Sequence, residues 1–281
     1  MADNRYEIRT ATRAEIGLMA DWAAAEGWNP GLHDADAFCA ADPNGFFLGL
    51  ADGEPVAAIS GIGYEGGFGF LGFYIVRPEF RGKGYGLRIW NACMAYLGGR
   101  NVGLDGVVAQ QRNYRESGFR LAWNNIRYEG VGAASPAAAG IVEAAAIPFD
   151  EIAAYDRTCF PAARDGFLKA WLAMPDAVAL ALRRGGRLAG YGVVRRCRMG
   201  HKIGPLFADD AQAAEHLFSA LAARCVGEPV FLDIPEINVA ARELVARHGM
   251  IPVFETARMY TGPDPDIALD RVFGITTFEL G

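Results

Sequence analysis

The stretch from residue 73 to residue 87 holds the residues whose types and spacing best suggest chemistry. Residues 73–76 are β-branched or aromatic, as in a buried strand. A loop with glycine at 82, 84 and 86 follows, and Arg81 and Lys83 give it positive charge. Apolar residues then recur at helical spacing: Leu87, Trp90, Met94 and Leu97. Glycine tolerates positive φ, and the free N–H groups of a helix N-terminus attract phosphate. The order strand, glycine loop, helix therefore predicts a phosphate or pyrophosphate site.

Two well-known phosphate loops do not fit this stretch. A nucleoside-triphosphate loop places Lys-Ser or Lys-Thr after its last glycine, whereas Leu87-Arg88 stands here. A dinucleotide loop spaces its glycines as G-x-G-x-x-G, whereas these glycines are evenly spaced. A flexible glycine-rich turn with incidental charge is the remaining alternative.

Composition narrows the class of protein. The 281 residues are 52% hydrophobic and 21% charged, which suits two globular domains. A net charge of −6 argues against nucleic-acid or membrane partners. The N-terminus predicts neither a signal peptide nor a transmembrane segment. The five cysteines lack a CxxC pair and the four histidines are scattered, so we expect reduced thiols, no metal site and a cytoplasmic protein.

The predicted elements repeat at the scale of a whole domain. The turns Asp52-Gly53 and Gly185-Gly186 are about 130 residues apart, and Gly118-Phe119 and Gly249-Met250 show the same offset. A repeat of this size indicates duplication. The small, uncharged residues between the repeats read as a linker. We therefore expect an N-terminal domain over 1–131, a linker over 132–140 and a C-terminal domain over 141–281.

The pattern Arg81-x-x-Gly84-x-Gly86, directly after a strand and a proline, resembles the coenzyme A pyrophosphate loop of the GNAT acetyltransferase superfamily. Residues 26–31 and 45–50 resemble a bacterial subgroup of tandem GNAT proteins with a degenerate C-terminal half. The resemblance implies an α+β (mixed α/β) protein of two tandem GNAT folds, each a mostly antiparallel twisted sheet flanked by helices. It also implies acetyl-CoA as donor, with the following cofactor contacts: Tyr74, Ile75, Val76, Arg81, Gly82, Lys83, Gly84, Tyr85, Gly86 and Asn113.

Tyr114 matches a second element of that family, Tyr-x-x-x-Gly-Phe, which ends here at Phe119. The resemblance implies that its phenol protonates the leaving thiolate, whose pKa of about 8.5 lies below the phenol's value of about 10. The alternative is a tyrosine that only packs in the core. The family often has Asn seven residues earlier, where this chain has Val107, and Gln110, Gln111 and Asn113 are candidates to replace its contacts.

The second half lacks both motifs. Val245 stands at the position corresponding to Tyr114, and residues 204–210 contain no glycine triplet and no arginine. Asp209 and Asp210 would repel a pyrophosphate but suit a helix N-terminus. We expect this half to bind no coenzyme A and to serve as structure or as a wall of the acceptor pocket.

Several residues are expected on the acceptor side. Trp28, Asn29 and Gln111 are predicted to contact the acceptor, and Glu65 and Asp105 are candidate bases. The amides near Ile75 and Val76 would polarise the thioester carbonyl. Arginines beside Cys197 and Cys225 suggest lowered thiol pKa values, but no histidine near either in sequence could serve as its base.

The sequence thus predicts an acetyl-CoA-dependent N-acetyltransferase that modifies a primary amine of a small molecule or peptide by direct attack. Tyr114 is the expected general acid, and a homodimer is possible. The alternatives are a non-catalytic acyl-CoA sensor or scaffold and a transferase for longer acyl groups.

Overall fold

The computed structural model describes residues 5–136 and 138–281. The first half, residues 5–131, contains these elements: β1 (Tyr6–Thr10), α1 (Arg13–Ala25), α2 (Asp34–Ala41), β2 (Phe46–Ala51), β3 (Glu54–Gly63), β4 (Phe68–Val76), α3 (Tyr85–Tyr96), β5 (Asn101–Val107), α4 (Gln111–Glu116) and β6 (Arg120–Val131). The second half, residues 141–281, contains these: β7 (Ile141–Glu143), α5 (Phe149–Cys159), α6 (Asp165–Leu172), β8 (Ala177–Arg184), β9 (Arg187–Arg196), β10 (His201–Ala208), α7 (Ala211–Ala222), β11 (Pro229–Pro235), α8 (Val239–Arg247), β12 (Ile251–Tyr260) and β13 (Val272–Gly274).

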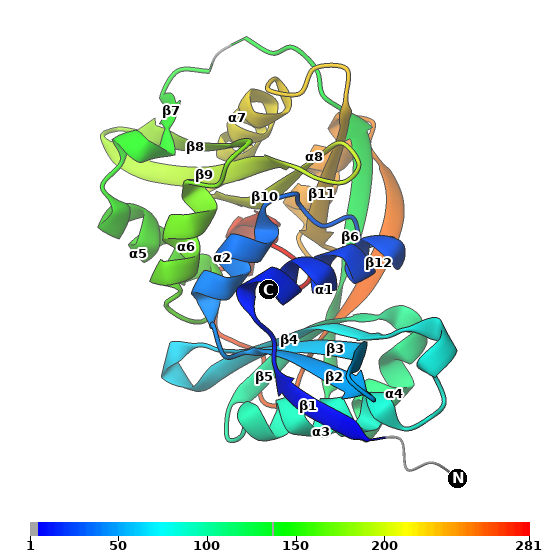
Figure 1. Ribbon diagram of the computed structural model, residues 1–281. Helices are drawn as coiled ribbons and strands as arrows, with labels where there is room; N and C mark the ends of the chain where they lie inside the picture. The colour runs from blue at the N-terminus through cyan, green and yellow to red at the C-terminus, as the bar shows by residue number, and fades with distance from the viewer. Residues whose placement is uncertain (1–4, 137) are drawn as a thin grey trace.

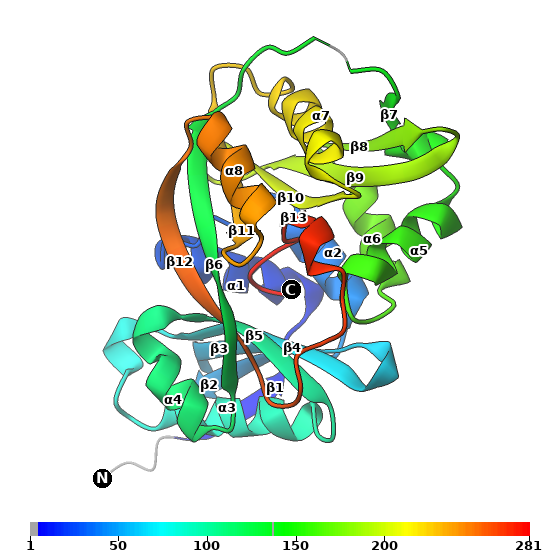
Figure 2. The same cartoon turned by 180° about the vertical axis from the view of Figure 1, so that it is seen from behind.

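The predicted mixed α/β class is confirmed, because helices flank one large, mostly antiparallel sheet (Figures 1 and 2). In the described part of the chain the named strands pair in parallel in two places, β4 with β5 and β10 with β11. Local signals explain several helix ends. Thr12 and Glu15 form the predicted capping box of α1, and Asp210 caps α7 by accepting a hydrogen bond from the Ala213 amide.

The sheet is continuous because the two halves exchange strands. β12 of the second half lies between β5 and β6 of the first half, and β6 in turn pairs with β11. Neither half therefore completes its own sheet. Both views show β6 and β12 side by side along the molecule, reaching from one half to the other (Figures 1 and 2).

Among the residues that the structure describes, buried ion pairs cross between the halves at three places. Each joins a first-half side chain to a second-half side chain: Asp34 to Arg195 at 2.8 Å, Arg127 to Asp233 at 2.6 Å, and Asp105 to Arg258 at 2.6 Å. Removing charges from water costs about as much as such pairs return. A shifted register would leave these charges buried without partners, so the pairs select one alignment of the two halves.

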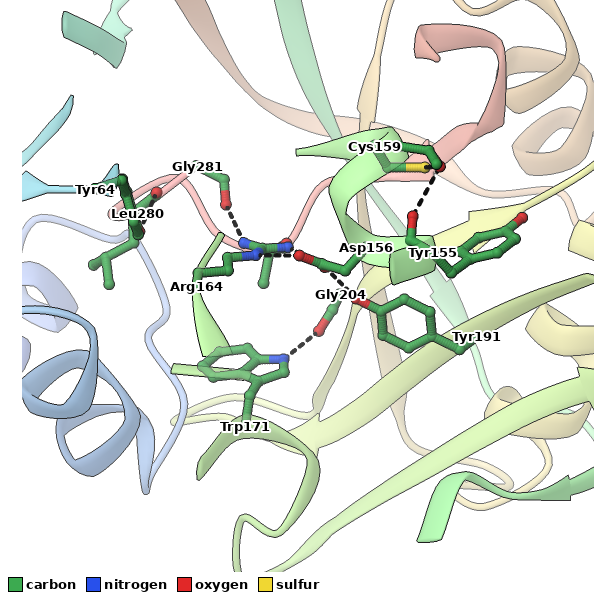
Figure 3. A network of polar contacts seen from close by, with 12 residues as sticks. Tyr64, Tyr155, Asp156, Cys159, Arg164, Trp171, Tyr191, Gly204, Leu280 and Gly281 are labelled. Carbon is green, nitrogen blue, oxygen red and sulfur yellow. Dashed lines mark hydrogen bonds and ion pairs between the residues drawn. The ribbon is translucent and has the colours of Figure 1, made fainter. Parts of the chain in front are cut away.

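The last residues of the chain run through the middle of the molecule. β10 pairs with β11 over residues 201–203. Farther along, at Leu206 and Phe207, β10 pairs with β13 instead. Residues 275–281, which we call the C-terminal segment, are buried and continue from β13 toward the first half. Arg164 donates to Thr276 Oγ1 at 2.9 Å, and Tyr64 donates to the Leu280 carbonyl at 3.1 Å. Figure 3 shows Tyr64 beside Leu280 and Arg164 beside Gly281. β13 thus fills the gap between β10 and β11, and the segment links both halves.

Glycines make room for this segment in both halves. A Cβ on Gly72 of β4 would lie 2.1 Å from the Glu279 carbonyl oxygen, and one on Gly204 of β10 would lie 2.6 Å from the Thr276 oxygen. Any side chain at either position would push the backbone of the segment away. No motif or repeat in the sequence marked residues 272–281, so their placement is known only from the structure.

The strand exchange predicts that the halves stay together after the linker is cut. We expect a specific protease site inserted between Ala133 and Ala134, both exposed, to be cleaved without separating the fragments. The reason is that β12 is held between β5 and β6 by backbone pairing on both edges. Size-exclusion chromatography of cut and uncut protein should give the same elution volume. Two half-sized species in native buffer would contradict the exchange.

Candidate active site

The glycine loop joins β4 to α3, in the predicted order. Gly82 and Gly84 have φ of 75° and 81°, in the left-handed region that favours glycine. Gly86 is required for packing, since a Cβ there would lie 2.7 Å from the Tyr74 hydroxyl oxygen. Within the described residues, the amides from Gly82 to Leu87 donate to no backbone or side-chain acceptor. This run of free N–H groups at a helix N-terminus is suited to an anion.

Arg81 fixes the base of the loop. Its Nε donates to the Val76 carbonyl at 2.8 Å, and its Nη2 pairs with Glu26 at 2.5 Å. The Val76 carbonyl thus points away from β3, and the next amide, Arg77, donates to β3 through Val56. The N–H and C=O of one strand residue face the same edge. The Val76 amide therefore faces the open edge of β4.

A cavity of about 360 Å³ opens where β4 and β5 part. The two strands pair in parallel only as far as Leu71 and Leu104. Beyond them Phe73 adopts a φ of 48°, and the register of β4 against β3 shifts. The facing edges of the two strands are left without a strand partner, and residues 71–76 and 104–107 line the cavity.

Tyr114 lies in the wall of this cavity, on the short helix α4. Its ring stacks on Trp90 at a centroid distance of 5.9 Å, which fixes its orientation. Its hydroxyl donates to no acceptor among the residues that the structure describes. Burial raises the pKa of Tyr114 to about 12, so the phenol is protonated at neutral pH. A protonated, unengaged hydroxyl beside a cavity is able to donate a proton or a hydrogen bond.

The second half supplies part of the cavity wall: Phe254 and Thr256 from β12, and Phe278 and Glu279 from the C-terminal segment. In the described structure, Thr256 Oγ1 and Glu279 Oε1 are buried without a hydrogen-bond partner. Burial raises the pKa of Glu279, and the nearby Lys202 opposes this shift. Sequence reasoning missed all four residues, because only the strand exchange and the segment bring them to the loop.

The predicted site residues fall into three groups. Those that line the cavity are Tyr74, Ile75, Val76, Arg81, Tyr114 and Trp28. Those on the adjoining loop and helix start are Gly82, Lys83, Gly84, Tyr85 and Gly86. Those placed outside the lining are Asn113, Gln111 and Asn29. Asn113 donates to Gln110 at 2.6 Å, and Gln111 accepts from Arg115. Asn29 exchanges hydrogen bonds of 2.9 Å with the Met199 backbone, which ties the halves together.

The other candidate groups are engaged or remote. Asp105 lines the cavity, but Arg258 and Asn125 occupy its oxygens. Glu65 lies in an exposed turn outside the lining. The suggested lowering of the thiol pKa values was wrong: burial raises the pKa of Cys197, and it raises that of Cys225 to about 11.

Within residues 5–136 and 138–281, no group of three or more His, Cys, Asp or Glu side chains is arranged to hold a metal ion. In the same residues, no helix is both long enough and apolar enough to cross a bilayer.

Known proteins share this architecture and sequence. Residues 14–119 match the acetyltransferase (GNAT) family, and residues 152–274 match a second acetyltransferase (GNAT) domain. The holothin acyltransferase of a Pseudoalteromonas strain is 32% identical over 98% of this chain and 95% of its own length. This chain belongs to the GNAT acyltransferase family.

Solved structures show the same tandem GNAT fold. A protein from Pyrococcus horikoshii superposes with a TM-score of 0.85 at 23% identity, over 100% of this chain and 99% of its own. A tandem GNAT protein from the clavulanic acid biosynthesis pathway superposes with a TM-score of 0.63 at 13% identity, over 92% of this chain and 100% of its own. The predicted membership of the GNAT superfamily and the predicted tandem arrangement are confirmed. GNAT acyltransferases use acyl-CoA donors.

The pKa of Tyr114 in this GNAT protein predicts a measurable titration. At pH 10, where an exposed phenol is about half ionised, Tyr114 should remain protonated, because burial favours the neutral form. The difference in near-ultraviolet absorbance between wild type and Tyr114→Phe should therefore show no phenolate contribution until the pH approaches 12. A phenolate signal from this residue already at pH 9 would contradict the buried setting.

Proposed function

We propose that the chain is an acetyl-CoA-dependent N-acetyltransferase that modifies a primary amine of a small molecule or peptide. One observation carries this proposal: a single cavity joins the open edge of β4, next to the glycine loop, to the protonated Tyr114 hydroxyl. A non-catalytic sensor would need the loop but not an unengaged acid beside it. The relative named for acyl transfer to holothin also favours a transferase.

The donor would lie along the loop and the parted strands. Its pyrophosphate would accept hydrogen bonds from the free amides of residues 82–87, with Lys83 adding charge. The amide-bearing pantetheine arm would pair with the unpartnered edge of β4, as an added strand does. The second half offers no such place, because β13 fills the corresponding gap and Asp210 caps α7.

The chemistry follows from the groups in the cavity. The unprotonated amine attacks the thioester carbonyl carbon, a C–N bond forms, and the C–S bond breaks. The Val76 amide, which faces this edge, would donate to the carbonyl oxygen as negative charge develops. Tyr114 would give its proton to the departing sulfur. The amine loses one proton, so coenzyme A leaves as the thiol and the product is an amide.

Replacing Tyr114 with phenylalanine tests the acid. We expect kcat to fall by roughly 10²–10⁴-fold, the usual contribution of a general acid. Acetyl-CoA affinity should change little, because the ring still stacks on Trp90. Tyr128→Phe on β6, outside the cavity lining, is the matched control and should behave as wild type. Coenzyme A release across a panel of amines measures the rate, and unchanged kcat in Tyr114→Phe would remove Tyr114 from the mechanism.

Replacing Gly84 with aspartate tests the placement of the pyrophosphate. Gly84→Asp puts a carboxylate at φ of 81° among the free amides, so we expect at least a tenfold loss of acetyl-CoA affinity. Gly66→Asp is the matched control, since Gly66 has φ of 72° in an exposed turn with open space around it. Both variants should lose about 1–2 kcal/mol of stability through backbone strain. Calorimetric titration of each variant separates the two effects, and intact binding by Gly84→Asp would move the donor elsewhere.

A further inference from the structure

The acceptor side of the cavity is lined by aromatic rings from both halves. Trp28 comes from the loop that follows α1, while Phe254 and Phe278 come from the second half. The rings of Phe254 and Phe278 are 5.9 Å apart and inclined by 49°. The guanidinium of Arg127 lies 4.8 Å from the Phe278 ring centroid, which holds that ring in place. A wall of fixed aromatic surfaces favours a flat, apolar ligand over a strongly hydrated one.

One buried carboxylate in this wall has no protein partner. Glu279 is 2% exposed, and within the described residues its side chain accepts no hydrogen bond, with Oε1 wholly enclosed. Leaving a carboxylate buried and unpaired is costly, so such groups normally have a partner. Thr256, whose Oγ1 is also buried without a partner in the described structure, lines the same cavity. Glu279 Oε2 is not enclosed in this way, so it is the oxygen of this carboxylate that can receive a hydrogen bond from a ligand.

The cations around Glu279 are held by other partners, although among the residues described Arg195 Nη1 is buried without one. Arg195 pairs with Asp34, and Arg127 pairs with Asp233. The ammonium of Lys202 donates to the Asn29 carbonyl at 3.0 Å, and burial lowers its pKa. The nearby cations stabilise the ionised form of Glu279 without forming a hydrogen bond to it. What this carboxylate lacks among the described residues is a hydrogen-bond donor, and the nitrogen of a bound amine would supply one.

We propose that the acceptor is a small primary amine on a flat, apolar body, with its nitrogen at Glu279 and its body against Trp28, Phe254 and Phe278. The proposal rests on the proposed function and assigns its substrate class. The amine binds as an ammonium ion, and Glu279 takes one of its protons, which frees the lone pair for attack. The nitrogen loses a second proton to solvent after the C–N bond forms, and Tyr114 gives its proton to sulfur as the C–S bond breaks. Solvent then returns one proton to Tyr114 and takes one from Glu279, so each turnover releases one proton.

The pH dependence follows from the surroundings of Glu279. The groups that face it are Asp34 from α2, Arg127 from β6, Arg195 from β9 and Lys202 from β10. Desolvation outweighs the cations among them and raises the pKa of Glu279 above the ordinary glutamate range. The carboxylate is therefore lost as the pH falls through this raised value. Wild-type kcat/KM should fall on that acidic side and level off above it.

The test uses acetyl-CoA with tryptamine and 1,5-diaminopentane, two primary amines of which only the first has a flat, apolar body. We expect kcat/KM for tryptamine to exceed that for the diamine by about tenfold or more, the worth of burying an aromatic ring. Glu279→Gln should bind acetyl-CoA as wild type does but lose roughly 10²–10⁴-fold in kcat. Its kcat/KM should rise about tenfold per pH unit toward the pKa of the amine, because only the free base then reacts.

Two further variants test whether the loss of rate in Glu279→Gln comes from the missing carboxylate. Glu279→Asp keeps the negative charge among its neighbours but withdraws it by one methylene, so it should fold and give an intermediate rate even if the glutamine variant misfolds. Glu255→Gln on β12, exposed and outside the cavity lining, is the matched control and should match wild type.

The outcomes separate the two proposals. Wild-type rates and pH profiles for Glu279→Gln or Glu279→Asp would overturn the role of Glu279. Acetylation of the diamine in preference to tryptamine would overturn the acceptor class while leaving acetyl transfer intact. Binding of acetyl-CoA with no coenzyme A release for any amine would overturn the proposed function, and the acceptor assignment with it.

Discussion

The exchange of β6 and β12 is the constraint on which the rest of the structure depends. Because β12 lies between β5 and β6, the edge of β5 that does not face the cavity is fully paired, while its other edge parts from β4. The same strand brings Phe254 and Thr256 to the opening. Without the exchange, the first half would keep its loop but lose a wall of the cavity. The one pairing arrangement thus brings the glycine loop and the second-half wall to the same cavity.

Buried ion pairs fix how the strands and helices of the two halves align. The pairs Asp105–Arg258 and Arg127–Asp233 fix β12 against β5 and β6 against β11, and Asp34–Arg195 fixes α2 against β9. Such pairs add little net stability, but misalignment would strand charges in the interior. Glu279 stands among them as the carboxylate that the described structure leaves without a partner. The paired charges align the halves, whereas Glu279 is the charge for which we propose a ligand as partner.

Local signals explain what the sequence could predict. The strand, the Arg81 loop and α3 are contiguous, and Tyr114 follows them closely, so their types and spacing are readable without tertiary structure. Glu279 and Thr256 are remote in sequence from that loop, and no periodic pattern marks residues 275–281. The arginines beside Cys225 and Cys197 suggested activated thiols, but neighbours in sequence cannot report the burial that raises both pKa values. Contacts made across the strand exchange were therefore beyond sequence reasoning.

The position of β13 distinguishes the second half from the first. β13 occupies the gap between β10 and β11, the counterpart of the place where we propose that the coenzyme arm lies in the first half. The residues that follow β13 then reach the cavity of the other half. If the proposed donor loop and acceptor wall are right, they are encoded in different halves of the chain. Substitutions in the second half could then change acceptor preference while the donor loop of the first half stays unchanged.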